Sequence, residues 1–419
     1  MASLRGADVS QTYDVVIFGA TSFVGQLVCR YLIDEVSPER PLSWAMAGRS
    51  EEKLRSTREG LGDRAKETPL IIADARDEEA LRALCAQTRV VLSTVGPYAL
   101  YGEPLLKACV EAGVDYCDLT GEVQWMRAML ERYEVVAQAS GARVVHCCGF
   151  DSIPSDMGLY YLQREAKAQL GAYCDRVTYR LKAARGGFSG GTVASLLNVS
   201  KELKGNPQLR RILADPYALC VGFEPIKTRQ PNVMGPTYDP DHQAWLAPFV
   251  MASINTRVVH RAHALLGRPY GAQFQYDEAT LMGSGLKGRL SATALSAGLG
   301  AFLGMTSITP TRALLERFVL PAPGEGPSPE EQERGFFDVR LFGERSSGGT
   351  LKVKVTGDRD PGYGSTAKMI TEAALTLAFD LSDQKREGGI WTPSTLMAEP
   401  LLARLTRYAG LSFEVLGHE

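Results

Sequence analysis

The chain has 419 residues, which is enough for two domains of ordinary size and a large apolar core. Its 46 Lys and Arg residues nearly balance its 48 Asp and Glu residues, for a net charge of −2. No basic run breaks this balance, so a nucleic-acid-binding surface is not expected. The eight cysteines form no CxxC pair, and Cys147 and Cys148 are adjacent, which does not suit a disulfide framework. With a short, polar N-terminus and no apparent signal peptide, these features predict a reduced, cytoplasmic protein.

Six apolar, strand-like runs alternate with helical patterns over residues 1–150. The runs are YDVVIF, SWAMAG, TPLIIAD, VVLSTVG, VDYCDLT and ARVVHCCG. Near-continuous apolar strands that alternate with helices indicate a parallel sheet covered on both faces. We therefore predict an α/β fold in which residues 1–150 form a Rossmann-like, doubly wound parallel sheet. Ligands of such a sheet bind beyond the carboxyl ends of its strands.

The pattern changes after Gly149. Residues 151–362 mix helices with the strand-like runs RVTYRLKAA, QFQYDEATL, FFDVRLFGE and LKVKVTGD. This mixture predicts a second, α+β domain that binds the substrate or pairs subunits and is built on a largely antiparallel sheet. A Pro-, Gly- and Glu-rich segment at 321–335 is expected to be a surface loop. Residues 363–419 predict an amphipathic helix followed by a short tail.

One long stretch is uncharged. No charged residue lies between Arg289 and Arg312, and the stretch 290–311 is close in length to a membrane span. Ser, Thr and Gly dilute its apolar residues, and Pro310 lies at its end. A buried or interfacial element is our preferred interpretation. Contact with a membrane surface or lipid is the second hypothesis, and a true span is the third.

The first strand runs into the turn GATSFVG, which predicts a phosphate-binding site. Gly19, Ser22 and Gly25 follow the spacing G-x-x-G-x-x-G, with serine in the middle position. Small residues are needed where backbone N–H groups and a helix N-terminus approach a pyrophosphate. Helix packing alone would also account for the glycines, but the position after the first strand favours a dinucleotide. The expected cofactor contacts in this turn are Gly19, Ala20, Thr21, Ser22, Phe23 and Val24.

The end of the second strand, AGRSEEKL, predicts which dinucleotide binds. An acid at this place suits the ribose 2′-hydroxyl of NAD, whereas an arginine suits the 2′-phosphate of NADP. Arg49 and Ser50 stand here, with Lys53 one helical turn on. Arg49 as a solvated charge at a helix start is the alternative; we predict NADP. Further expected contacts are Gly48, then Asp74 and Ala75 near the adenine, and Thr94, Val95, Gly96, Pro97 and Tyr98 beside the nicotinamide.

Several stretches resemble the saccharopine dehydrogenase-like oxidoreductases, especially the mycobacterial trans-acting enoyl reductases of phthiocerol-type lipid biosynthesis. VGPYALYGEP and GFDSIPSD are the most specific; FGATSFVG, SGGTVASLLN and IWTPSTLM extend the resemblance over nearly the whole chain. Family members usually have glycine where this chain has Ser22. The resemblance implies NADPH binding, a Rossmann-like first domain, and a second domain for a long-chain or polyketide substrate. It also implies a homodimer and a helix at 365–382 that packs back near the first domain.

The same resemblance bears on where the protein acts. Animal members of the family associate with lipid surfaces, although they are richer in apolar residues at the position of 290–311. The protein is expected in the cytoplasm, and the second hypothesis for 290–311 predicts peripheral contact to the inner face of the plasma membrane through this segment. Its expected partner is a small-molecule or carrier-bound lipid substrate.

Reduction of an enoyl C=C bond needs a hydride at the β-carbon, stabilisation of the enolate, and a proton for the α-carbon. The candidate catalytic residues are Tyr98, Tyr101, Glu122 and Asp151. The tyrosines are placed to donate a proton or hydrogen bond to the thioester or ester oxygen. Glu122, like Asp118, is placed to orient water or the nicotinamide amide, and Asp151 and Ser152 to border the cleft. The structural alternatives are packing for the tyrosines, a helix-start position for Glu122 and helix capping for Ser152.

Other residue types point to no further chemistry. His146 is expected in the core, and His260 and His263 have no acid or cysteine close in sequence, so no metal site is expected. A saccharopine-type C–N oxidoreductase acting on an amino acid is the alternative enzyme. It would need arginines to converge in the second domain, where Arg180, Arg185, Arg210, Arg211, Arg257 and Arg261 are available. The third hypothesis is a non-catalytic, NADP-binding, lipid-associated scaffold.

Overall fold

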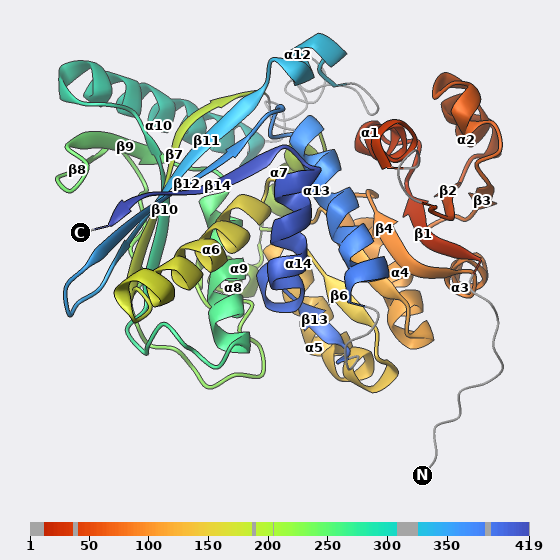
Figure 1. The fold of residues 1–419 in the computed structure, drawn as a ribbon, viewed down its shortest axis with the longest axis horizontal. Helices are drawn as coiled ribbons and strands as arrows, with labels where there is room; N and C mark the ends of the chain where they lie inside the picture. Colours follow the sequence, from red (N-terminus) through yellow and green to blue (C-terminus); the bar gives the residue numbers. More distant parts are fainter. Residues whose placement is uncertain are drawn as a thin grey trace.

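The computed structural model describes residues 12–36, 41–186, 190–203, 205–307, 326–381 and 387–418. Within these residues the chain forms two seven-stranded sheets. Figure 1 shows the first sheet, built mainly from the N-terminal third, on one side of the molecule and the second sheet on the other. Helices α6 (Ile153–Leu170), α9 (Ala252–Leu265) and α14 (Pro393–Arg407) lie between them.

The first sheet is parallel in every pair, with the order β13-β6-β5-β4-β1-β2-β3. The predicted doubly wound sheet is therefore confirmed. Its strands are β1 (Tyr13–Phe18), β2 (Trp44–Gly48), β3 (Leu70–Ile72), β4 (Thr88–Ser93), β5 (Asp115–Asp118), β6 (Arg143–Val145) and β13 (Gly389–Trp391). All residues of β2 are buried, which is how a strand covered on both faces must be composed.

Helices connect successive strands of this sheet. They are α1 (Phe23–Tyr31), α2 (Glu51–Gly60), α3 (Glu78–Cys85), α4 (Tyr98–Ala112) and α5 (Val123–Ser140). A π-helical turn, η1 (Leu32–Val36), extends α1, and a 3-10 turn, η2 (Asp63–Ala65), precedes β3. Asp77 caps α3 by accepting hydrogen bonds from two of its first N–H groups, at 3.0 and 3.1 Å.

The second sheet is mixed, with the order β14-β12-β11-β7-β10-β9-β8. Only the β7–β10 pair is parallel, so the predicted, largely antiparallel α+β unit is also confirmed. Buried and less buried residues alternate along β11, as expected for a sheet with one face on the core. The strands are β7 (Arg176–Arg185), β8 (Thr237–Asp239), β9 (Ala244–Pro248), β10 (Gln275–Leu281), β11 (Phe336–Glu344), β12 (Thr350–Gly357) and β14 (Leu411–His418).

The C-terminal region is more than the expected helix and tail. Helix α13 (Gly364–Leu375), extended by the π-helical turn η3 (Thr376–Asp380), packs on α1 and contacts β4 and β5. After it, β13 joins the first sheet beside β6, and β14 joins the second beside β12. The description of this part as a tail is thus wrong, since it holds the helix α14 and the eight-residue strand β14 as well as β13. Of these, β13 has only three residues, too few for an apolar pattern to be detected.

Two other segments differ from expectation. Within the expected loop 321–335, the described part holds a short helix, α12 (Pro329–Glu333), which begins at a capping box of Ser328 and Glu331. Most of the uncharged stretch 290–311 lies in α10 (Gly285–Ser307); residues 308–311 lie outside the described part. One side of α10 packs on β9 and on α7 (Gly190–Glu202), and its other side is exposed. None of the described helices is long and apolar enough to cross a bilayer.

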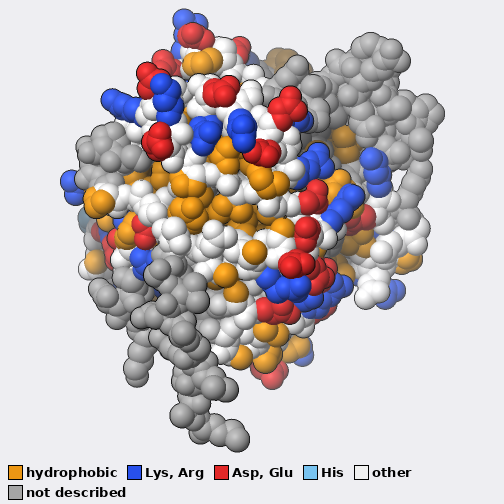
Figure 2. Space-filling model, turned by 90° about the vertical axis from the view of Figure 1, so that its right-hand side faces the viewer, with side chains coloured by type: hydrophobic (Ala, Val, Ile, Leu, Met, Phe, Trp, Pro, Cys, Tyr) orange, Lys and Arg blue, Asp and Glu red, His pale blue; other side chains and the backbone are white. Residues whose placement is uncertain are grey.

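Figure 2 shows the side of the molecule that carries α2 and β3. Hydrophobic side chains form a band across its middle, and Lys and Arg side chains are interspersed with Asp and Glu side chains above and below that band. Interspersed charges of opposite sign produce no field of a single sign, and salt screens exposed charges beyond about one Debye length of roughly 10 Å. An anion bound on this side therefore depends on individual side chains and N–H groups.

Candidate functional site

The glycine turn after β1 leaves no room for larger residues. Gly19 has a φ of +92°, and a Cβ there would lie 2.7 Å from both Thr94 Oγ1 and Val95 Cγ2. A Cβ on Gly25 would lie 2.2 Å from the carbonyl oxygen of Gly19. These distances bring the N-terminus of α1 close against the first strand, as a pyrophosphate-binding turn requires.

Ser22 replaces the middle glycine without closing this turn. Its hydroxyl caps α1 by accepting a hydrogen bond from the N–H of Gly25 at 3.0 Å, and it lies 2.9 Å from Thr94 Oγ1. The Thr94 hydroxyl donates to the carbonyl oxygen of Gly19 at 3.0 Å. The N–H groups of Phe23 and Val24, in the first turn of α1, have no backbone partner among the described residues. They remain available for the oxygens of a pyrophosphate.

Arg49 and Lys53 are free cations at the end of β2. Both side chains are exposed, and neither has an ion pair within the described part of the chain. Ser50 caps α2 by accepting a hydrogen bond from the N–H of Lys53 at 3.3 Å. The carboxylate of Glu51 forms an ion pair with Arg55, with Oε1 2.5 Å from Nη2. A phosphate at this place would therefore meet two unpaired positive charges.

We expect the substitution Arg49→Glu to weaken NADPH binding more than NADH binding. A charge-assisted hydrogen bond contributes about 1.5–3 kcal/mol, which corresponds to a roughly tenfold to hundredfold loss of affinity. Titration of cofactor fluorescence measures both dissociation constants. Arg64→Glu, which changes an exposed arginine on η2, is the matched control. Equal losses for both cofactors would contradict the assignment of Arg49 to the 2′-phosphate.

The remaining predicted cofactor residues lie at neighbouring strand ends. Gly48 is buried, and its carbonyl oxygen accepts a hydrogen bond from the N–H of Ala73 at 3.0 Å, which ties the ends of β2 and β3 together. Asp74 is half-buried and accepts from the N–H of Arg76 at 2.9 Å, across Ala75. Thr94, Val95, Gly96 and Pro97 follow β4 directly and remain predicted contacts.

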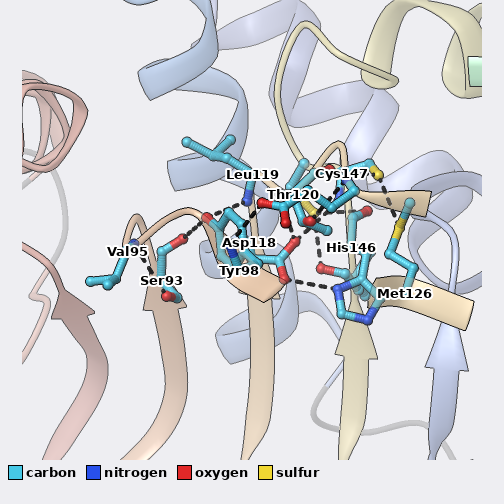
Figure 3. A network of polar contacts seen from close by, with 12 residues as sticks. Ser93, Val95, Tyr98, Asp118, Leu119, Thr120, Met126, His146 and Cys147 are labelled. Carbon is cyan, nitrogen blue, oxygen red and sulfur yellow. Dashed lines mark hydrogen bonds and ion pairs between the residues drawn. The ribbon is translucent and has the colours of Figure 1, made fainter. Parts of the chain in front are cut away.

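Tyr98 has a structural role in this arrangement. Its hydroxyl donates to the carbonyl oxygen of Ser93 at 3.0 Å and accepts from the N–H of Leu119 at 3.1 Å, so it joins the ends of β4 and β5 (Figure 3). Only 5% of the side chain is exposed, and burial raises its pKa well above the ordinary value. A hydroxyl that is buried and engaged in this way is poorly placed to donate a proton to a substrate.

Glu122 is also held in structural contacts. It is fully buried, and its carboxylate accepts hydrogen bonds from the N–H groups of Tyr98 at 2.7 Å and Ala99 at 3.0 Å. It therefore caps the N-terminus of α4 from a distant part of the chain. Ser195 of α7 donates a third hydrogen bond at 2.8 Å. Burial raises the pKa of Glu122 despite these donors.

Tyr101 and Asp151 are the candidates with side chains that are not committed to such contacts. Tyr101 is half-buried on α4, with the guanidinium of Arg76 5.5 Å from its ring centroid. Asp151 is half-buried in the turn after β6 and makes no hydrogen bond or ion pair within the described chain. Burial raises its pKa to about 7. A carboxyl group with this pKa is partly protonated at neutral pH, which is the property of a general acid.

A buried hydrogen-bonded chain leads from Ser152, the neighbour of Asp151, into the second sheet. Ser152 donates to Asn255 Oδ1 at 3.0 Å, and Asn255 Nδ2 donates to Glu278 at 2.8 Å. The hydroxyl of Tyr276 donates to the other oxygen of Glu278 at 2.7 Å. Burial raises the pKa of Glu278 to about 7. Ser152 therefore fixes the turn that carries Asp151 against α9 and β10, and its own side chain does not cap α6.

An Asp–His pair that no local sequence pattern indicates joins the ends of β5 and β6. His146 Nδ1 lies 2.8 Å from Asp118 Oδ2, and the other oxygen of Asp118 accepts from the N–H groups of Thr120 and Cys147 (Figure 3). Both side chains are buried. Cys147 follows with a φ of +62°, an uncommon conformation for a residue with a Cβ. The expected core position of His146 is confirmed, but the partner on β5 was not foreseen.

The arginines that an amino-acid substrate would need do not converge. Arg180 is buried between Asp277 at 2.7 Å and Asp239 at 3.3 Å. Arg261 donates to the carbonyl oxygen of Leu219 and to Glu134, and Arg257 donates to Thr256 and to the carbonyl oxygen of Leu213. The other three are exposed, on β7 and on α8 (Pro207–Ala214): Arg185, Arg210 and Arg211. Three of the six arginines thus make separate internal hydrogen bonds and form no common site for a substrate carboxylate.

Two stretches that carry the resemblance meet in space. Asp156, from GFDSIPSD, is buried and accepts hydrogen bonds from the N–H of Ser394 at 2.7 Å and from its hydroxyl at 2.8 Å. Ser394 belongs to IWTPSTLM, at the start of α14. Burial raises the pKa of Asp156 to about 6. This contact fixes the C-terminal region to the turn that carries Asp151.

Over the ranges that the structure describes, no group of three or more His, Cys, Asp or Glu side chains could hold a metal ion. His260 and His263 pack instead among Tyr217, Tyr270 and Phe274. All eight cysteines are free thiols.

Comparison with known proteins agrees with the geometry. Residues 15–145 match the family model described as the saccharopine dehydrogenase NADP binding domain. A trans-acting enoyl reductase of Mycobacterium tuberculosis is 37% identical over 403 residues, which cover 94% of this chain and 95% of the relative. One of Mycobacterium leprae is 35% identical over 408 residues, again covering 94% of this chain and 95% of the relative.

A solved structure shares the two-sheet fold. The apo saccharopine dehydrogenase (L-Glu forming) from Saccharomyces cerevisiae has a TM-score of 0.51 and 14% identity, covering 97% of this chain and 100% of that chain. The predicted resemblance and the predicted cofactor are therefore confirmed. The chain belongs to the saccharopine dehydrogenase-like family and is an NADP-dependent oxidoreductase.

Proposed function

We propose that this oxidoreductase reduces an enoyl C=C bond of a lipid or polyketide intermediate with NADPH. The observation that carries the proposal is the position of Asp151, a carboxyl group with a pKa of about 7 at the sheet edge where the nicotinamide is expected. The names of the full-length mycobacterial relatives support the same chemistry. NADPH supplies a hydride when bound.

The chain's own residues have separate tasks in this proposal. The N–H groups of Phe23 and Val24 hold the pyrophosphate, and Arg49 holds the 2′-phosphate. Asp151 donates the proton that the substrate α-carbon needs, and Tyr101 is placed to give a hydrogen bond to the substrate carbonyl oxygen. Tyr98 and Glu122 keep β4, β5 and α4 in register and touch no substrate.

Turnover with a defined substrate panel tests this proposal. NADPH oxidation is measured with purified protein and long-chain enoyl thioesters, both free and bound to a carrier protein. Saccharopine-pathway amino acids form the second panel. Turnover of the enoyl thioesters supports the proposal, and turnover of only the amino acids would contradict it. NADPH binding with no turnover of either panel would favour the scaffold hypothesis.

The amino-acid alternative has one observation in its favour, the shared fold of saccharopine dehydrogenase. At 14% identity this likeness concerns the fold alone. The internal pairing of Arg180, Arg257 and Arg261 counts against a cluster that binds substrate carboxylates. We therefore retain the enoyl substrate as the proposal.

Peripheral membrane contact through α10 is part of the proposed function. Leu286 and Leu290 are 72% and 61% exposed, and no acidic residue occurs in the helix, where Lys287 and Arg289 lie beside them. Exposed leucines flanked by cations suit the surface of an anionic bilayer. We expect flotation with vesicles that contain anionic lipid, and loss of flotation in Leu286→Glu/Leu290→Glu. Flotation that is equal for both proteins would contradict this contact.

The expected homodimer stays a prediction. Light scattering during gel filtration measures the mass of the particle in solution and so tests it.

A further inference from the structure

A pocket lies away from the glycine turn, at the C-terminal end of α9. It has a volume of about 410 Å³ and is bounded by α9, by residues 225–229 and by residues 271–274. This volume falls within the range of roughly 300–1,000 Å³ that is typical of small-molecule sites. None of the contacts proposed for NADP or for the enoyl substrate involves its lining.

Packed rings form the floor of this pocket. Tyr217, His260, His263 and Phe274 line it. The ring centroids of Tyr217 and His260 are 4.9 Å apart, and those of His263 and Phe274 are also 4.9 Å apart. His260, His263 and Phe274 are only 1–3% exposed, because they pack against one another beneath the pocket surface. Tyr217 is half-buried, so its ring is the one on which a planar ligand can stack.

The rim of the pocket carries three cations and no carboxylate. Lys227, Arg229 and Arg268 line it, and no Asp or Glu does. Lys227 and Arg229 are exposed and have no ion pair among the residues described. Arg268 donates a hydrogen bond to the carbonyl oxygen of Glu224, so its positive charge is not neutralised by a carboxylate. Unpaired guanidinium and ammonium groups around a concave site favour phosphate.

The two histidines add no charge to the pocket. Burial lowers the pKa of His260 to about 3 and that of His263 to about 4, so both rings are neutral at physiological pH. His263 Nε2 lies 3.2 Å from the carbonyl oxygen of Gly271, while its Nδ1 has no partner in the described chain. His260 is 1% exposed, and its Nε2 likewise has no partner there. Both nitrogens are inaccessible to solvent, so the two histidines lie beneath the pocket surface and leave it without charge.

The wall of the pocket is preformed. Thr228 donates to the carbonyl oxygen of Ala272 at 2.8 Å, and its own carbonyl oxygen accepts from the Tyr217 hydroxyl at 2.6 Å. Gln230 donates to the carbonyl oxygen of Phe274 at 2.9 Å and accepts from the N–H of Tyr276 at 3.0 Å. These bonds hold the segment that carries Lys227 and Arg229, although it contains no helix or strand. A preformed wall lowers the entropy that binding would cost.

We propose that this pocket binds a nucleoside phosphate at a site separate from that of NADP. The phosphate meets the cationic rim, and the base stacks on the ring of Tyr217. The same chemistry is present in free nucleotides and in the adenosine phosphate end of coenzyme A thioesters. The inference does not depend on the enoyl substrate.

Calorimetric titration of NADPH-saturated protein tests the proposal. ADP and coenzyme A are the probes, and adenosine is the uncharged control. We expect ADP to bind at least tenfold more tightly than adenosine. Lys227→Glu/Arg229→Glu should weaken ADP binding at least tenfold, because it reverses two positive charges of the rim. Both residues are exposed, so the exchange leaves the core intact. The matched control, Arg334→Glu/Lys352→Glu, makes the same change in charge at exposed positions outside the pocket.

The outcomes are distinct. ADP and coenzyme A of equal affinity assign the site to free nucleotides, whereas at least tenfold tighter coenzyme A assigns it to the thioester. No binding of either probe to the NADPH-saturated protein would overturn the proposal. So would ADP binding that NADPH displaces, or equal ADP affinity in the pocket variant and its control.

Discussion

Substitution of Asp151 by Asn is expected to reduce turnover by about 10²–10⁴-fold, the range over which a positioned general acid acts. Asn has nearly the same shape, but it cannot supply the proton that the substrate α-carbon needs. The dissociation constant of NADPH should stay within about twofold of the wild type, because no cofactor contact is assigned to Asp151. Steady-state rates with an enoyl thioester and fluorescence titration of NADPH measure the two quantities.

The pH profile separates a proton donor from a residue that only supports the fold. Burial raises the pKa of Asp151 to about 7, so the wild-type rate should fall as the pH rises above 7 and the proton is lost. The residual rate of Asp151→Asn should lack this step. Asp63→Asn, which alters an exposed carboxylate on η2, is the matched control. A variant with more than a third of wild-type turnover and an unchanged profile would exclude Asp151 as the donor.

Asp156→Ala is expected to lower the free energy of unfolding by about 2 to 5 kcal/mol, the largest stability effect that we predict. The change removes both carboxylate oxygens that accept from Ser394. The buried N–H of Ser394 is then unpaired, and its hydroxyl keeps only the 3.4 Å contact with Thr392 Oγ1. A buried polar group without a partner costs about 1–3 kcal/mol. Ser394→Ala, which keeps the backbone hydrogen bond, should cost only about 1 kcal/mol. Urea unfolding measures both variants, and equal losses would contradict this account.

The same carboxyl predicts a pH dependence of stability. Burial raises the pKa of Asp156 from 3.8 to about 6 in the folded protein. The folded state therefore binds this proton more tightly, and the resulting stability is present below pH 4 and lost as the pH rises through 6. For this group the loss is about 3 kcal/mol. Asp156→Asn should thus be less stable than the wild type at pH 4, and the difference should shrink by pH 8. A constant difference would contradict the raised pKa.

Parts of the candidate site were predictable because their signals are local. The turn of Gly19, Ser22 and Gly25 must lie at the carboxyl end of β1, since a strand, a tight turn and a helix follow one another within a few residues. The unpaired Arg49 after β2 follows from the same rule. Asp151 was found in this way too, because the turn after the sixth strand opens at the same edge of a parallel sheet.

Other assignments depended on contacts that carry no local pattern. Glu122 lies where a helix begins, as expected, yet its carboxylate caps α4, more than twenty residues earlier in the chain. Tyr98 has the residue type of a proton donor, but its hydroxyl is already hydrogen-bonded to the carbonyl oxygen of Ser93 and to the N–H of Leu119. Burial and satisfied hydrogen bonds, which removed both from the catalytic candidates, are properties of the packed structure alone.

The sequence by itself determined the parallel sheet, the position of the glycine turn and the prediction of NADP, because apolar period, glycine spacing and a single arginine are signals of short stretches. Only the tertiary structure decided how the C-terminal region completes both sheets and how Asp156 meets Ser394, 238 residues later in the chain. It also decided that the carboxyl group of Asp151 has no hydrogen bond or ion pair among the described residues. A residue's pKa and its free hydrogen-bonding capacity depend on neighbours from distant segments, so no stretch of sequence contains them.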